Sequence, residues 1–370
     1  MKNRIVVLPA ALLLSLFAFA AVAQTPAQTP SAPAPQGPAV KVPPASLAAP
    51  PPTAAPPADP LPPANPRFFT ATTPSLATVN AFLNQVWGFD KDRIYRVMAI
   101  QTTAAPGVTK VTVFVTTKEP GAKPQAAIFY VLPDGTHAIG EGSGVVPFGA
   151  TPFAPTRDLL REKANGAWSG NPSKDFELVE FADLQCPHCK EAQPIMEQIA
   201  KDFPKAHIVF QPFPLVDLHT SAFKAAAYGV CAQQQSNQAF FKYAAGVFDT
   251  QEGLSPSTDD TILKAAAMRA SLDGAAIQAC AATQQTKDTV DADIKLAEQI
   301  GIDQTPLLVA NGRILPLNSN ATTPEGKAKF YDDLKQLIQF QATLDGVDSG
   351  ATAETLAPKP PPPTLQNLPK

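Results

Sequence analysis

The residues with the clearest chemistry are two cysteines separated by two positions, in the segment Cys186-Pro187-His188-Cys189. An apolar run of strand length, 176–181, precedes this segment, and apolar residues at helical spacing follow it, so the first cysteine is expected at a helix N-terminus. Unpaired amides and the helix dipole favour a thiolate there, which makes Cys186 the predicted nucleophile. Pro187 suits the first helical turn because its missing amide proton is not needed. We expect His188 to add positive charge or a donor near the sulfur, and Cys189 to be the shielded resolving thiol.

Two further cysteines bear on the alternative that the pair is half of a zinc site. Zinc sites usually draw on a second closely spaced pair of ligands, whereas Cys231 and Cys280 stand alone in the sequence. We therefore predict no metal. In an exported protein these two residues are expected to pair, and the disulfide would stabilise the fold by about 4 kcal/mol in the chain-entropy model. Two buried free thiols are the alternative.

The elements around the dithiol follow the order β-α-β, helical insertion, β-β-α. The pattern predicts strands at 176–181 and 208–210 on either side of a helix that starts at the dithiol, and consecutive helices over 221–299. Thr305-Pro306 then introduces a hairpin that turns at Asn311-Gly312, and a closing helix spans 325–341. The predicted fold class is α/β.

These motifs together resemble the exported thiol-disulfide oxidoreductases of the DsbA-like thioredoxin superfamily, over residues 172–342. The resemblance implies a thioredoxin-like fold and a cis peptide bond before Pro306, which would lie across from the dithiol. A proline at position 306 leaves the backbone of Thr305 free to pair with an extended substrate peptide. An ordinary loop is the alternative reading of Thr305-Pro306.

The resemblance also assigns a role to Glu180, six residues before the first cysteine. It implies that Glu180 is the buried acid under the active site, with a raised pKa and the ability to shuttle the proton of Cys189. A carboxylate at a solvated strand end is the other reading. His207 and His219 are interpreted as ordinary polar residues, with a place on the active-site face as the alternative for His219, and His137 is expected to be exposed.

The sequence before this domain predicts a small α+β domain at 67–149 and a connecting segment at 150–171. A helix from Ser75, strands at 94–102, 108–117 and 126–132, and a hairpin turn at Asp134-Gly135 support it. The layout weakly resembles periplasmic disulfide isomerases of the DsbC and DsbG type, whose N-terminal module forms dimers. We therefore predict a dimerisation module, the alternative being that its sheet edges are covered within one chain.

The two ends of the chain differ from its middle in composition. Residues 1–23 have two basic residues, an apolar run and a small-x-small site, which predict a signal peptide cleaved after Ala23; an uncleaved anchor is the alternative. Residues 24–66 and 343–370 hold more than half of the 41 prolines and are predicted to be disordered tails. The net charge of −3 argues against nucleic acid as a partner.

The leading hypothesis is a periplasmic enzyme that introduces disulfides into protein substrates through Cys186 and Cys189, without a metal or organic cofactor. Its expected partners are reduced or misfolded exported proteins, a membrane redox partner that resets the dithiol, and a second copy of the chain. A dimeric disulfide isomerase or reductase is the first alternative. A non-catalytic envelope chaperone or scaffold is the second.

Overall fold

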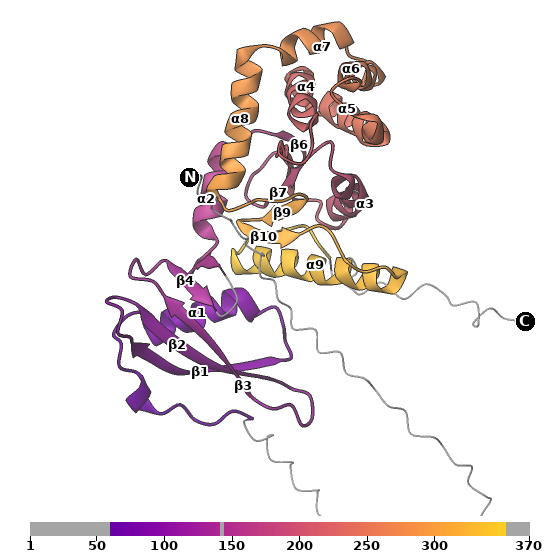
Figure 1. Ribbon diagram of the computed structural model, residues 1–370. Coiled ribbons are helices and arrows are strands. Elements are labelled where there is room, and N and C mark those ends of the chain that lie inside the picture. The colour runs from indigo at the N-terminus through magenta and orange to yellow at the C-terminus, as the bar shows by residue number, and fades with distance from the viewer. Residues whose placement is uncertain (1–59, 141–143, 353–370) are drawn as a thin grey trace, which may run out of the picture. The chain divides into compact units, whose positions relative to one another are not determined.

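A computed structural model describes residues 60–140 and 144–352, which fall into two compact units (Figure 1). The first unit contains the described residues up to Leu76 together with Asp92–Val146, and the second contains Ala77–Lys91 and the residues from Pro147 onward. The predicted signal peptide and residues 24–59 and 353–370 of the two predicted tails lie outside the described residues.

The first unit is built on a sheet whose strands follow one another in chain order. It comprises β1 (Arg93–Thr102), β2 (Thr109–Thr117), β3 (Gln125–Val131), β4 (His137–Gly140) and β5 (Val145–Pro147). Strands β1 to β4 pair antiparallel with their neighbours. The turn between β3 and β4 contains Gly135 with φ of 70°, a left-handed conformation that glycine adopts at little cost. The sequence predicted β1, β2 and β3 to within one residue and the hairpin turn after β3, but not the three-residue β5.

The chain is ordered earlier than the predicted end of the proline-rich tail at residue 66. The Arg96 guanidinium donates hydrogen bonds to the carbonyl oxygens of Leu61, at 2.7 Å, and Pro62, at 2.8 Å, and Leu61 is buried. A 3-10 helix, η1 (Pro66–Phe68), follows. A proline-rich stretch has carbonyls but few amide donors, so an arginine on a neighbouring strand can hold it in place.

The second unit contains a five-stranded mixed sheet. Its strands are β6 (Ala167–Gly170), β7 (Glu177–Ala182), β8 (His207–Pro212), β9 (Leu307–Ala310) and β10 (Arg313–Pro316), in the order β10-β9-β7-β8-β6. Strands β7 and β8 are parallel and flank α3 (Pro187–Asp202) in sequence, and the other pairs are antiparallel. The predicted α/β class with a thioredoxin-like domain is confirmed.

Helices cover both faces of this sheet (Figure 1). Residues of α3 and α9 (Pro324–Leu344) form one apolar cluster with Leu178, and residues of α2 (Ala154–Lys163) and α8 (Gln284–Gln299) form another with Val179. Successive side chains of a strand point to opposite faces. Glu180, two residues after Leu178, is therefore directed toward α3.

The helical insertion forms an apolar core of its own. It comprises α4 (Ala222–Gln235), α5 (Asn237–Thr250), α6 (Asp259–Arg269), α7 (Gly274–Ala281) and α8, with the short η2 (Gln251–Gly253) after α5. Tyr228, Phe240, Tyr243 and Leu263 are buried among small alanines, which let the helices approach closely. A disulfide between Cys231 and Cys280 joins α4 to α7, with the two Cα atoms 6.1 Å apart.

Strand β6 lies in the predicted connecting segment at 150–171, for which the sequence indicated no strand. A β-carbon on Gly166 would collide with the carbonyl oxygen of Phe210, and one on Gly170 would collide with that of Ala206. These glycines therefore allow β6 to approach β8 closely, where the sequence suggested a turn. Helix α2, Ala154–Lys163, also lies in this connecting segment.

Two segments extend the second unit beyond its predicted limits of 172–342. Helix α1 (Leu76–Trp87) was predicted as part of the small α+β domain, but most of it belongs to the second unit. There the Arg313 guanidinium donates a hydrogen bond to the carbonyl of Gln85. At the other end, Ser349 is buried and its carbonyl accepts a hydrogen bond from the Lys205 amide at 3.3 Å. Within the described ranges, no helix is long and apolar enough to cross a membrane.

Candidate active site

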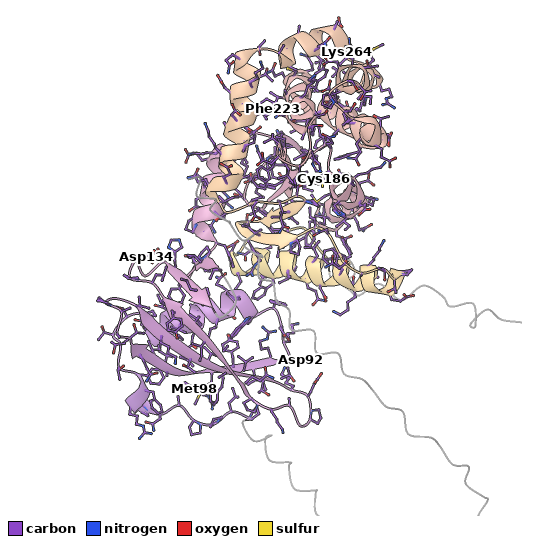
Figure 2. All side chains as sticks on the ribbon, in the orientation of Figure 1. Asp92, Met98, Asp134, Cys186, Phe223 and Lys264 are labelled. Atoms are coloured by element: carbon purple, nitrogen blue, oxygen red, sulfur yellow. A yellow bond between two sulfur atoms is a disulfide. The ribbon has the colours of Figure 1, made fainter. Side chains whose placement is uncertain are left out.

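The dithiol lies at the junction between β7 and α3. Figure 2 labels Cys186, its first residue. Cys186 is the N-cap residue of α3 and is only 4% exposed, while Cys189, one turn into the helix, is fully buried. Both thiols are free. The Asp183 amide lies 3.4 Å from the Cys189 sulfur, so the turn before the helix contributes a donor to the inner thiol.

The two thiols have opposite electrostatic environments. A hydrogen bond from the Cys189 thiol, with further help from Thr305 and the backbone amides of Cys189 and His188, lowers the pKa of Cys186 to about 5, although burial opposes this shift. Burial and the neighbouring Cys186 sulfur raise the pKa of Cys189. At neutral pH the outer sulfur is therefore a thiolate and the inner one a protonated thiol.

The His188 imidazole is not the group that stabilises the thiolate in this structure. Its Nδ1 lies 3.1 Å from a carboxylate oxygen of Glu191, and both side chains are mostly exposed. The donor that this residue supplies to the Cys186 sulfur is its backbone amide, at the start of α3. Pro187 occupies the first position of the helix, as its missing amide proton allows.

Thr305 and Pro306 lie beside the dithiol although they are more than a hundred residues away in sequence. The peptide bond between them is cis, and the Thr305 carbonyl oxygen is 3.9 Å from the Cys186 sulfur. Among the described residues, the buried Thr305 hydroxyl has no hydrogen-bond partner of normal geometry. It is thus available to a neighbouring thiolate, in keeping with the lowering effect of Thr305 on the pKa of Cys186.

Glu180 is buried on the α3 side of β7. Burial raises its pKa to about 7, and a hydrogen bond from Gln193 partly opposes the shift. The Gln193 amide nitrogen lies 2.9 Å from the Glu180 carboxylate and 3.0 Å from the Cys189 carbonyl oxygen. Sequence reasoning missed Gln193, although its position one turn after Cys189 places it on the same face of the helix.

His219 reaches the site through an aspartate in the turn. Asp183 is buried; one of its carboxylate oxygens accepts from the Gln185 amide at 2.7 Å, and the other lies 2.7 Å from His219 Nδ1 and accepts from the Leu215 amide at 2.9 Å. The other two histidines singled out from the sequence lie elsewhere. His207 donates to the Asn171 carbonyl, and the ring of His137 pairs with an aspartate of its own hairpin.

The described part of the chain, 60–140 and 144–352, contains no group of three or more His, Cys, Asp or Glu side chains arranged to hold a metal ion. Cys231 and Cys280 are bonded to each other, in the helical insertion. The dithiol itself supports nucleophilic attack by a thiolate on a disulfide, followed by attack of a second, protected thiol.

Comparison with known proteins connects this geometry to a family. Residues 162–339 match the model of the thioredoxin family. The sodium/proton antiporter NhaA 3 of Salinispora tropica is 26% identical over 175 residues, which cover 47% of this chain and 24% of the antiporter. The match thus spans about a quarter of that relative's length.

Two solved structures are among those to which the chain is similar. ScsC of Proteus mirabilis in a transitional conformation has 22% sequence identity and a TM-score of 0.41, covering 53% of this chain and 78% of its own. The thiol-disulfide exchange protein alpha-DsbA2 of Wolbachia pipientis has 18% identity and a TM-score of 0.38, covering 49% and 97%. The family match coincides with the β7-α3-β8 unit, the helical insertion and the β9-β10 hairpin, and it includes both active-site cysteines. Residues 162–339 therefore match the thioredoxin family, and the matched segment holds the dithiol.

Proposed function

We propose that the protein is an exported thiol-disulfide oxidoreductase that introduces disulfides into protein substrates. The observation that supports this direction most is the lowering of the pKa of Cys186 to about 5 at a helix N-terminus. Stabilising the thiolate stabilises the reduced protein, and a dithiol that is stable when reduced is a strong oxidant when it is a disulfide.

The reaction would begin with the oxidised Cys186-Cys189 pair. A substrate thiolate attacks the Cys186 sulfur, the bond between the two cysteines breaks, and its electron pair passes to Cys189, which takes up a proton. Glu180, buried beside α3 with a pKa near 7, is the proposed source of that proton. A second substrate thiolate then attacks the substrate sulfur of the mixed disulfide and expels the Cys186 thiolate. Two electrons have moved from the substrate dithiol to the protein.

The proposal includes the setting of the reaction. The substrates would be reduced or misfolded exported proteins in the periplasm, held as extended peptides along the backbone of Thr305 beside Pro306. A membrane redox partner would reoxidise Cys186 and Cys189. The predicted signal peptide supports export.

The sheet of the first unit supports a second candidate function, that of a dimeric disulfide isomerase. Its sheet ends at β1 and β5, and unpaired sheet edges are common sites of pairing between chains. Against this, the backbone around Phe69 pairs with Ile100 of β1, so part of one edge is covered within the chain. Light scattering of the mature protein separates the two candidates, because an isomerase of this design requires a mass of two chains.

The redox equilibrium with glutathione tests the proposed direction. We expect the reduced protein to be favoured over the disulfide even in glutathione mixtures that leave structural disulfides intact. We also expect the wild-type protein to oxidise reduced ribonuclease faster than the Cys186→Ser variant does. A dithiol that is oxidised more readily than glutathione would overturn the oxidase assignment, and wild-type activity equal to that of the control would support a non-catalytic scaffold.

A further inference from the structure

Hydrogen bonds join residues 183–186, the turn that leads into α3, to the helical insertion and to the residues just before it. Besides the Asp183-His219 contact, the Gln185 carboxamide oxygen accepts a hydrogen bond from the Ser221 amide at 2.8 Å, and its nitrogen donates to the Leu254 carbonyl at 3.3 Å. Ser221 precedes α4 and Leu254 follows η2. The turn at residues 183–186 is thus contacted by two segments that lie more than thirty residues apart in sequence, at Ser221 and at Leu254.

Gln251 makes the contact nearest to the nucleophile. It is the first residue of η2, is 5% exposed, and donates from its side-chain nitrogen to the Leu184 carbonyl at 3.1 Å and to the Cys186 carbonyl at 3.2 Å. These two carbonyls lie on either side of Gln185. One buried amide group therefore fixes the orientation of two peptide planes in the turn.

The orientation of the Cys186 peptide decides whether its sulfur faces the helix. The same carbonyl accepts from the Cys189 amide at 3.1 Å and the Lys190 amide at 3.3 Å, which defines Cys186 as the N-cap. With this backbone in place, the sulfur meets the amides of His188 and Cys189 at the positive end of the helix dipole. A change in the orientation of this peptide would therefore weaken these contacts together.

We propose that Gln251 is a positioning residue that holds the Cys186 sulfur against the first amides of α3, so that the helical insertion sets the oxidising strength of the dithiol. The inference rests on the proposed function of that dithiol. Gln251 acts through the two carbonyls of the turn, to which its side-chain nitrogen donates.

Gln251→Met tests the proposal because methionine keeps the length of the side chain and removes the donor. The matched control is Gln233→Met: Gln233 also lies in the insertion and donates to a backbone carbonyl, that of Asn165, at 2.7 Å, but away from the dithiol. We expect Gln251→Met to raise the pKa of Cys186 by about 0.5 to 1 unit and to shift the glutathione equilibrium by about threefold to tenfold toward the protein disulfide. The control should change neither.

Thermal unfolding of the same proteins separates positioning from simple support of the fold. A folded Gln251→Met protein with lowered stability but an unchanged pKa of Cys186 and an unchanged equilibrium would overturn the proposal. If Gln251→Met does not fold, Gln251→Asn gives the same measurement, because its shorter amide cannot reach both carbonyls. A wild-type protein that fails to oxidise ribonuclease would refute the proposed function instead, while the thiol titrations would still decide the role of Gln251.

Discussion

The hydrogen bond between the two active-site thiols makes the largest contribution to the low pKa of Cys186. Two substitutions of the inner residue separate this bond from the other contributions. Cys189→Ser keeps a donor group of similar size, whereas Cys189→Ala removes the donor and leaves the backbone amides and Thr305 in place. The serine variant should therefore hold the pKa of Cys186 near 5, and the alanine variant should not.

The expected difference follows from the strength of a hydrogen bond to a charged acceptor. Such a bond contributes about 1.5–3 kcal/mol, and one pKa unit corresponds to about 1.4 kcal/mol. Removing it should raise the pKa of Cys186 by about one to two units, to roughly 6–7. This remains below the ordinary thiol value of about 8.5 because the helix amides still favour the charged form.

Ultraviolet absorbance of the thiolate against pH measures both values directly. The Cys186→Ser protein is the control, since its remaining reduced thiol, Cys189, should not ionise in the neutral range. Equal midpoints in the serine and alanine variants would show that the thiol-thiol bond is unimportant. A midpoint near 8.5 in the serine variant would refute the reasoning altogether.

Three further predictions concern other parts of the site and the insertion. Burial raises the folded-state pKa of Glu180 from 4.5 to about 7, so the stability that its protonated form contributes is present at low pH and is lost as pH rises toward 7. Glu180→Gln should therefore flatten the pH dependence of the melting temperature across this window. Thr305→Val should raise the pKa of Cys186 by about half a unit or more through loss of the hydroxyl, and an unchanged thiol titration would argue against this role. Replacing Cys231 and Cys280 by alanine should lower the free energy of unfolding by about 4 kcal/mol in denaturant titrations, while exchange at Cys186 continues.

The position of the dithiol between a strand and a helix could be predicted from the sequence because its signals are local. An apolar strand, a Cys-Pro-His-Cys segment and a helical stripe are adjacent in the chain, so β7 and α3 follow from periodicity alone. The cis bond before Pro306 followed from the family resemblance, since nothing in the spacing of Thr305 and the cysteines indicates that they meet.

The features that the sequence did not predict depend on contacts between distant segments. Strand β6 exists because Gly166 and Gly170 approach β8 closely, whereas glycine in isolation suggests a turn. Gln193 and Gln251 have no distinguishing motif, and their roles appear only when a helix face and a loop of the insertion meet backbone carbonyls near the dithiol. For the same reason, periodicity indicated helix α1 but not the unit to which it belongs.

Mass spectrometry of a single-turnover exchange tests the central claim most directly. Oxidised protein is mixed with an equal amount of a reduced protein that has two thiols, and the reaction is stopped with an alkylating reagent. We predict that the substrate gains one disulfide as Cys186 and Cys189 become alkylatable, while the Cys231-Cys280 bond remains intact. An active-site disulfide that remains closed while the substrate stays reduced would contradict the assignment of the dithiol as the reactive centre.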